Sequence, residues 1–468
     1  MSFFLRKLNI KNKYKVPTST HIRNMATIIV LMYLIIISIG TLLLYLPISR
    51  VDHQCLLLDS FFTSTSAVCV TGLTLGDTAT TWTLFGQIVI LLLFQIGGLG
   101  YMTLAVAMFV VMGKNIGLQE RIQFKETQGI TELAGLKQLA KNMVTYALCV
   151  EVIGVILLWI VFACEPTTKG GNPFYLAVFH SVSCFCNAGF DLFGSIFSPD
   201  CGLIPLNKNP YLLLTLASLS ILGSFGYIAF KDLIIPERKR KRSTQTKIVF
   251  TTTITLLTIG TVIFFFSEFN HSMKDLSVWQ SILNSFYLSA TARSTGMGNV
   301  EIGSLSIIAY CTLIFLEIIG GSPSGTAGGI KTTTLAILFA SVKSALTKKE
   351  DTEIFGRRIS SRYVNRAIAI VFFYILISLL ATIILGFTES KTVMDPNNAL
   401  RLQTDVFSTL GTVGLANGLH RSFSFAGKIV FICLMIIGRV GALTVFNVLV
   451  FSNKKINRRY PFDDVTIG

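Results

Sequence analysis

The sequence predicts an all-α polytopic membrane protein with eight transmembrane helices, arranged as four repeats of span, re-entrant loop and span. Apolar residues make up 52% of the 468 positions and charged residues only 14%, against roughly 25% charged residues in ordinary soluble domains. Uncharged runs at 82–112, 248–267 and 367–388 are each at least the ~20 residues that cross a bilayer core. Four similar polar segments, each ending in glycine, lie between apolar runs of this kind.

These four segments are spaced almost evenly along the chain. Their last glycines are separated by 117, 107 and 118 residues, and one quarter of the chain is 117 residues. A fourfold repeat with a glycine-ended loop in each copy predicts four quarters around one axis, with the loops meeting there as in a pore. The segments are 65–72, 183–189, 291–296 and 408–414, and they end at Gly72, Gly189, Gly296 and Gly414.

Each quarter is predicted to hold two spans around one half-length helix and its loop. The first apolar run follows a basic segment and shows no signal-peptide cleavage site, so we expect a retained first span. A half-length run such as 56–66 or 281–290 is too short to cross the membrane. The predicted spans and re-entrant segments are 25–47 and 83–112 around 56–73, 138–163 and 211–235 around 174–192, 247–267 and 305–346 around 279–298, and 365–387 and 425–451 around 399–416.

The distribution of basic residues predicts the orientation. The net charge is +16, and 29 of the 40 Lys and Arg fall on one side of the predicted membrane, which marks the cytoplasmic face. Both termini are therefore expected in the cytoplasm, with basic loops facing anionic lipid head groups and no role in binding nucleic acid. The expected divisions are a basic N-terminal arm at 1–24, repeats at 25–112, 113–235, 236–346 and 347–451, and a cytoplasmic tail at 452–468.

The four loops are predicted to form a cation filter made of backbone carbonyls. Carbonyl oxygens replace the hydration shell of a monovalent cation and release it readily, and glycine tolerates the backbone angles that point successive carbonyls at an axis. The negative end of each half-helix favours cations at the same place. Cys184 and Cys186 lack companion ligands, so no transition-metal site is expected. The predicted filter residues, with K⁺ at their carbonyls, are Val70, Thr71, Gly72, Asn187, Ala188, Gly189, Ser294, Thr295, Gly296, Thr412, Val413 and Gly414.

The run 305–346 is predicted to be a broken helix. A continuous helix of this length would measure roughly 60 Å, about twice the bilayer core, and the polar, glycine-rich stretch 320–334 interrupts it. We expect this stretch to be a gate that occludes the pore below the filter, the alternative being a kink without a moving part. Deletion of 321–329 is expected to raise ion flux without changing ion preference. The predicted gate residues are Gly320, Gly321, Ser322, Gly325, Gly328, Gly329, Lys331 and Arg439.

Two arginines at membrane depth are functional candidates by their position. Arg439 lies in the last span, at a depth suited to reach the 320–334 loop. Arg293 lies within the third filter loop and is expected to brace that loop from behind through a carboxylate, because a bare cation at the axis would repel the permeant ion. Glu151 and Glu317 are the two alternatives for that carboxylate.

Several motifs together resemble the Trk/Ktr/HKT superfamily of cation transporters. They are 291–296 (TARSTG), 187–190 (NAGF) and 322–333 (SPSGTAGGIKTT), and the resemblance covers essentially the whole chain. With eight spans the chain is most similar to the bacterial Ktr membrane subunit, KtrB. The superfamily has a potassium-channel-like architecture, and the fourth loop carries Thr-Val-Gly, the first half of a potassium-channel filter. Cys69 and Cys186 depart from the hydroxyl or amide residues that such loops more often carry.

The resemblance implies a potassium-translocating subunit of an uptake system in a bacterial plasma membrane. Glycine at all four filter positions goes with potassium, whereas serine at the position of Gly72 goes with sodium. It further implies Na⁺ as an activator, a homodimer, and a cytoplasmic nucleotide-binding regulatory ring of the KtrA type. No enzyme activity or cofactor is expected in this chain. The alternatives are a sodium-conducting or unselective cation transporter of the same superfamily and, more distantly, an alternating-access secondary carrier.

Overall fold

The computed structural model describes residues 19–54, 56–100, 103, 106, 136–168, 170–234, 242–390 and 398–441. Parts of the predicted organisation lie outside these residues. They are the beginning of the N-terminal arm, the end of the predicted span 83–112, most of the basic stretch 113–142, the basic run at 235–241, the end of the predicted span 425–451, and the tail.

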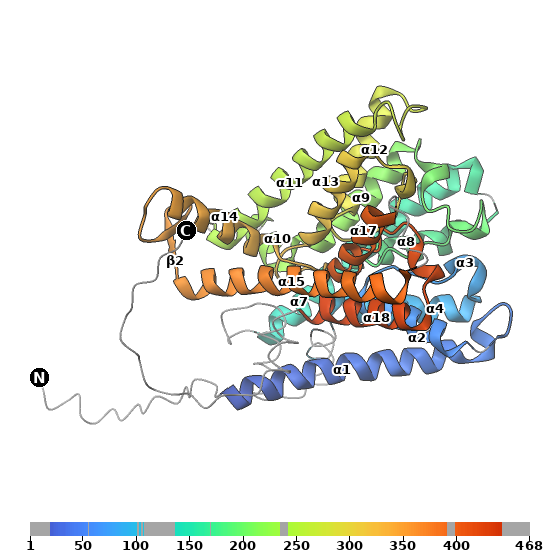
Figure 1. Ribbon diagram of the computed structural model, residues 1–468. Helices are drawn as coiled ribbons and strands as arrows, with labels where there is room; N and C mark the ends of the chain where they lie inside the picture. The colour runs from blue at the N-terminus through green and yellow to red at the C-terminus, as the bar shows by residue number, and fades with distance from the viewer. Residues whose placement is uncertain are drawn as a thin grey trace, which may run out of the picture.

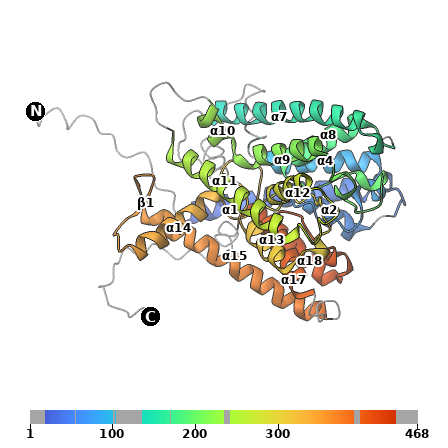
Figure 2. The same ribbon diagram turned by 90° about the horizontal axis from the view of Figure 1, so that it is seen from above.

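Four long helices supply clear membrane spans. They are long and apolar enough to cross a bilayer, and only 22–39% of the residues in their most apolar windows are buried. Most of their side chains therefore face outward, as expected of helices in contact with lipid. Helices α7 and α15 run along opposite edges of the molecule in Figure 2. The four are α1 Ser19–Tyr45, α7 Leu136–Cys164, α11 Thr244–Glu268 and α15 Ser361–Thr388.

Four half-length helices pack inside this outer set. Each has 13 or 14 residues and packs against one long helix, in the pairs α1–α2, α7–α8, α11–α12 and α15–α17. Two of them start at capping signals: Asn172 caps α8, where Pro173 takes the first turn, and Ser277 with Gln280 forms a capping box on α12. They are α2 Leu57–Cys69, α8 Pro173–Cys186, α12 Val278–Thr291 and α17 Asn398–Gly411.

A second set of helices returns through the interior, and within the described residues it is interrupted at 226 and at 319–331. We expected 211–235 to run as one helix, but it bends by 100° between two helices. The break is at Gly226, and its backbone angles of φ 85° and ψ 129° recur closely at Gly100 and Gly441. Residues with a Cβ avoid this region, whereas glycine adopts it. The helices are α4 Leu84–Leu99, α9 Pro210–Phe225, α10 Tyr227–Ile234, α13 Ile307–Ile318, α14 Thr332–Leu346 and α18 Phe425–Val440 (Figure 1).

Short elements connect these helices. Beyond the end of α14 lies an antiparallel hairpin in which Thr352 pairs with Ile359. Its two turn residues, Phe355 and Gly356, both have positive φ, which suits a two-residue hairpin turn. The remaining elements are α3 Thr78–Thr81, strands β1 Thr352–Ile354 and β2 Arg357–Ile359, and the 3-10 helices Pro47–Ser49, Pro166–Thr168, Phe193–Ser195, Ile204–Leu206, Ile302–Ser304 and Leu419–Ser422.

One packing contact recurs in three of the four quarters. The hydroxyl of a buried serine in the half-length helix donates to a backbone carbonyl of the long helix. The same serine packs against a glycine of the long helix, three residues after the residue that carries this carbonyl. The glycine gives the room for this close approach, so each bond holds a half-length helix to its outer helix. The bonds are Ser64 to Ile37 O at 2.8 Å, Ser181 to Glu151 O at 2.7 Å and Ser289 to Leu257 O at 3.1 Å.

Loss of one of these hydroxyls should destabilise the fold measurably. Ser181→Ala removes the interhelical bond to Glu151 O, and we expect a loss of about 0.5–1 kcal/mol of unfolding free energy. Thr215→Ala is the matched control, because Thr215 donates to Tyr211 O within its own helix. Thermal unfolding of both variants in detergent checks this; equal melting temperatures for the two would contradict it.

Candidate functional site

The four glycine-ended loops form a closed ring in the order of the chain. All four glycines have positive φ, between 71° and 92°. A Cβ built on each would fall against the carbonyl oxygen of the residue just before the next glycine. The chain therefore approaches itself too closely for any side chain at these positions. The contacts run from Gly72 to Ala188 O, from Gly189 to Thr295 O, from Gly296 to Val413 O, and from Gly414 to Thr71 O.

Three of the four loops leave their half-length helix by the same turn. Val70, Asn187 and Thr412 each take the left-handed conformation, at φ 58°, 60° and 52°. In each loop two amides then return to the last turn of the helix; in the second, Asn187 N donates to Cys184 O at 3.1 Å and Ala188 N to Ser183 O at 2.7 Å. This is the usual left-handed helix end, formed here without glycine. It turns the following residues toward the centre of the ring.

The third loop is built differently. Its helix ends at Thr291, and the amides of Ser294, Thr295 and Gly296 all donate to the single carbonyl of Thr291 at 3.1–3.2 Å. Among the residues between Thr291 and Gly296, none has positive φ. The third quarter therefore reaches the same ring position by another route.

A cavity of about 420 Å³ opens on one side of the ring and is lined by all four of its glycines. Its described lining contains four carboxylates and two guanidiniums, so its formal charge is negative. Such a mouth attracts cations. One of the guanidiniums, Arg421, pairs with Asp200 and donates to Thr74 O at 3.2 Å, and the other, Arg401, donates to Gly303 O at 2.8 Å.

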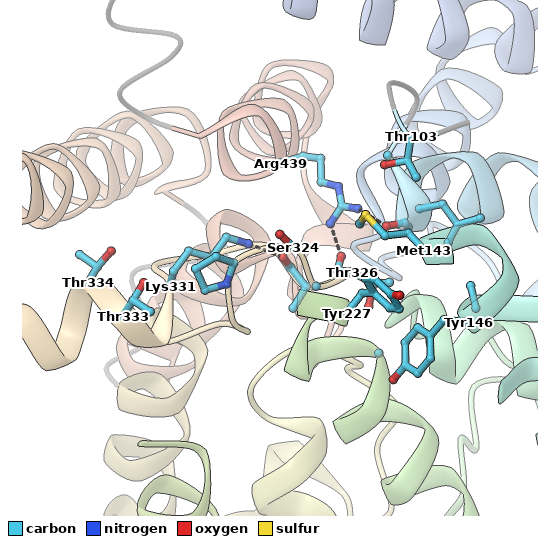
Figure 3. A pocket seen from close by; sticks show the side chains of 18 of the residues that line it. Thr103, Met143, Tyr146, Tyr227, Ser324, Thr326, Lys331, Thr333, Thr334 and Arg439 are labelled. Carbon is cyan, nitrogen blue, oxygen red and sulfur yellow. Dashed lines mark hydrogen bonds between the residues drawn. The ribbon is translucent and has the colours of Figure 1, made fainter. Parts of the chain in front are cut away.

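A second cavity, of about 390 Å³, lies beside the interrupted helix α13–α14 and has the opposite charge. Lys331, Arg366 and Arg439 line it, and its described lining holds no carboxylate. Arg439 donates to Thr326 O, to Gly97 O and, at 3.3 Å, to Gly98 O. Figure 3 shows Arg439 and Thr326 facing each other across this space. The arginine thus joins residues 319–331, between α13 and α14, to the end of α4.

Residues 319–331, called the intramembrane loop below, replace the middle of the predicted helix 305–346. The two ends of the loop are tied together, because Gly320 N donates to Ile330 O at 3.0 Å and Ile330 N to Ile318 O at 3.2 Å. Thr332, expected within the loop, begins α14. The loop therefore leaves the end of α13 and returns beside it before α14 begins.

The loop docks on the break between α9 and α10 through its backbone. Ser322 N donates to Ser224 O at 2.8 Å and Thr326 N to Gly223 O at 3.0 Å. The predicted gate residues occupy this docked loop and its contacts. Gly321 and Gly325 face Ser224 O, Gly328 faces Thr412, Gly329 has φ 65°, and Lys331 Nζ donates to Ala327 O at 2.7 Å.

Arg293 lies behind the ring, as its position in the loop suggested, but its contact is not a carboxylate. Its side chain is 3% exposed, and Nη2 donates to Gly320 O at 3.3 Å. No ion pair joins it to Glu151 or Glu317 within the described chain. The Glu151 carboxylate instead accepts from Gln95 Nε2 at 3.0 and 3.1 Å. A carbonyl oxygen at the start of the intramembrane loop therefore takes the role that we expected of a carboxylate.

Sequence reasoning missed two residues that the structure brings into the site. Thr326 lies in the intramembrane loop and Ser220 in α9, and both are buried beside Asn187. The loop's glycine-rich composition drew attention to its glycines, not to this threonine. A signal for the helix break at Gly226 was present, because Gly-x-x-Gly occurs at 223–226 and again at 97–100 and 438–441.

The comparisons with known proteins agree with this geometry. The family model described as "TrkH: Cation transport protein" matches residues 3–458. The chain is 35% identical over 440 residues to the potassium/sodium uptake protein NtpJ of Enterococcus hirae, covering 93% of this chain and 95% of that protein. It is 33% identical over 441 residues to the Ktr system potassium uptake protein B of Bacillus subtilis, covering 93% and 95%.

A solved structure supports the same fold. The potassium transporter TrkH from Vibrio parahaemolyticus superposes with a TM-score of 0.69 at 18% identity, over 94% of this chain and 86% of that one. The sequence match extends over nearly the whole chain and the structural likeness over the same length. The chain therefore belongs to the TrkH family of cation transport proteins, which are membrane transporters and not enzymes.

Proposed function

We propose that the chain conducts K⁺ through the ring of four loops. The observation that carries this proposal is the closed sequence of contacts in which each glycine meets the carbonyl of the next loop. Such a ring brings successive backbone carbonyls around one axis, and carbonyls without fixed charge suit a dehydrated monovalent cation. The filter residues are those predicted above, from Val70–Gly72 to Thr412–Gly414. A potential of 100 mV is worth about 2.3 kcal/mol per charge, which drives uptake without ATP.

The architecture that we propose around this filter has eight spans. The four long helices supply the first span of each quarter, and α4, α9 with α10, α13 with α14, and α18 supply the second. The half-length helices then lie between them as pore helices, and the negative cavity is the extracellular mouth. By the positive-inside rule both termini are cytoplasmic.

We assign the intramembrane loop as the gate. It is tied to its neighbours by weak individual bonds, and Arg439 and Lys331 place positive charge beside it. A permeating cation in the inner cavity meets both the loop and this charge. The loop's glycines and its backbone docking on residues 223–227 suit an element that moves as a unit.

K⁺ is the ion that the names of these relatives have in common. Their printed names describe potassium uptake, and the first of them also names sodium. The second candidate is therefore a transporter that carries Na⁺ as readily as K⁺, while in the leading proposal Na⁺ acts as an activator. Relatives named as parts of a Ktr system support an assembly in which a homodimer binds a cytoplasmic nucleotide-binding ring of the KtrA type.

The direct test is ion flux driven by membrane potential into proteoliposomes that contain the purified chain. We expect K⁺ uptake that excess Na⁺ does not replace. Equal fluxes of the two ions would support the second candidate. Absence of flux, both alone and after addition of a KtrA-type ring protein, would overturn the proposal.

Two glycines at the mouth provide a matched pair for testing the ring. Gly296→Ala places a Cβ at positive φ against Val413 O, whereas Gly298→Ala places one 3.6 Å from Val300 O, an ordinary distance. A Cβ in the left-handed region alone costs about 1–2 kcal/mol. We expect K⁺ uptake to fall about tenfold or more in Gly296→Ala and to stay near normal in Gly298→Ala. Similar uptake by the two variants would show that the ring contact is unimportant.

Deletion of 321–329 tests the gate. The deletion removes the docking bonds of Ser322 and Thr326 and the acceptor of Arg439, so we expect K⁺ flux to rise above that of the unmodified chain. The same proteoliposome assay measures it, after gel filtration has shown that the variant is monodisperse. Flux equal to that of the unmodified chain would rule out a gating role for this segment.

A further inference from the structure

Thr326 uses all its polar groups to join the intramembrane loop to other parts of the molecule. Its amide donates to Gly223 O at 3.0 Å, its hydroxyl donates to Phe185 O at 3.0 Å, and its carbonyl accepts from Arg439. The hydroxyl also accepts from Asn187 Nδ2 at 2.6 Å. The residue is 5% exposed. It is therefore the point at which the intramembrane loop touches the second filter loop.

Asn187 also forms a hydrogen bond with the third filter loop. Its side-chain oxygen accepts from Thr295 Oγ1 at 2.7 Å and from Ser220 Oγ at 2.8 Å. Asn187 is fully buried, and its backbone is in the left-handed turn that starts the loop. Thr295 carries the carbonyl that faces Gly189 in the ring. The hydrogen bond between Thr295 and Asn187 therefore joins the second and third filter loops behind the ring. The contact of Gly189 with Thr295 O joins the same two loops within the ring.

The orientation of the Asn187 amide depends on Thr326. An amide has one end that donates and one that accepts. The acceptor end faces Thr295 and Ser220. The donor end donates to the Thr326 hydroxyl, and its one other acceptor among the described residues is Phe185 O at 3.4 Å. Without the hydroxyl the donor end loses its short bond inside a buried site, which costs free energy. The Asn187 side chain is then held mainly at its acceptor end, so it gains freedom and the joint between the second and third filter loops loosens.

The intramembrane loop also contacts the backs of the other neighbouring filter loops. Arg293 of the third loop donates to Gly320 O at 3.3 Å, and Gly328 lies so close to Thr412 of the fourth that a Cβ would overlap Thr412 Oγ1. The loop therefore runs beneath the third filter loop from the second to the fourth. A displacement of the loop removes supports from three of the four filter loops together.

We propose that Thr326 is a positioning residue that couples the intramembrane loop to the ion preference of the filter. In the docked state its hydroxyl fixes Asn187 and, through it, the joint between the second and third loops. Release of the loop frees that joint, so the open pathway discriminates less between K⁺ and Na⁺. This inference rests on the proposed function and replaces the sequence-based expectation that deletion of 321–329 leaves ion preference unchanged.

Four variants in proteoliposomes test the coupling. Thr326→Val removes the hydroxyl at nearly constant shape, and Thr326→Ser keeps it. Ser220→Ala removes a donor to Asn187 without touching the loop's backbone docking. Thr215→Val is the matched control, a threonine of α9 whose hydroxyl donates to Tyr211 O within its own helix and takes no part in this network. K⁺ and Na⁺ fluxes are measured separately for each.

We expect Thr326→Val to raise flux and to lower the ratio of K⁺ to Na⁺ flux by about fivefold, the effect of about 1 kcal/mol for one hydrogen bond. Ser220→Ala should lower the ratio without raising flux. Thr326→Ser and Thr215→Val should match the unmodified chain in both. A second measurement needs no conduction: the melting temperature of the purified chain should rise more in K⁺ than in Na⁺, and Thr326→Val should reduce that difference.

The coupling is overturned if Thr326→Val raises flux while its ion ratio and its K⁺-dependent melting shift stay unchanged, because the loop is then only a plug. It is equally overturned if Thr326→Ser behaves like Thr326→Val, since the hydroxyl is then not the coupling group. Failure of the proposed function looks different. In that case the unmodified chain itself shows no K⁺ flux and no difference between the two ions in melting temperature.

Discussion

The close approach of four loops around one axis is the constraint on which the rest of the molecule depends. Each glycine lies against a carbonyl of the next loop, so no quarter can be displaced without disturbing its neighbours. The backbone amides and carbonyls of buried loops need hydrogen-bond partners within the protein, because there is little water to supply them. The half-length helices provide these partners, because carbonyls at their ends accept hydrogen bonds from the loop amides. The buried serines of three quarters then fix those helices to the outer spans, which face lipid.

The four quarters are similar in plan but unequal in detail, and the differences gather around the third. Its loop is held by the one carbonyl of Thr291 instead of by a left-handed turn. Its second helix is interrupted by thirteen residues, whereas that of the second quarter is interrupted by the single residue Gly226. The two departures meet where Arg293 bonds Gly320. The fourth quarter departs as well, with buried Val406 at the position eight residues before Gly414 where the first two quarters carry their packing serine. In the proposed function, asymmetry of this kind would let one quarter carry the gate while the others keep the ring in place.

Charge is arranged along the same axis. The cavity lined by the four ring glycines has an excess of carboxylates, whereas the charged side chains in the described lining of the cavity beside α13–α14 are all cations. Arg439, Lys331 and Arg293 each donate to a backbone carbonyl of the intramembrane loop. Carbonyl partners leave the positive charge of each group uncompensated, unlike an ion pair. The cavity beside the intramembrane loop is therefore lined by basic side chains that no carboxylate of its described lining neutralises.

The membrane class, the positions of the four ring glycines and the interruption near residue 320 could be predicted from the sequence, because long uncharged runs and regularly spaced glycines are local patterns with direct physical meaning. The sequence also indicated that Arg439 would reach the broken helix. The partner of Arg293, the bend at Gly226 and the place of Thr326 beside Asn187 emerged only from the packed fold. Thr326 and Asn187 are 139 positions apart in the chain. Their contact arises from packing the second and third quarters against each other, and no local pattern records which polar side chains that packing brings together.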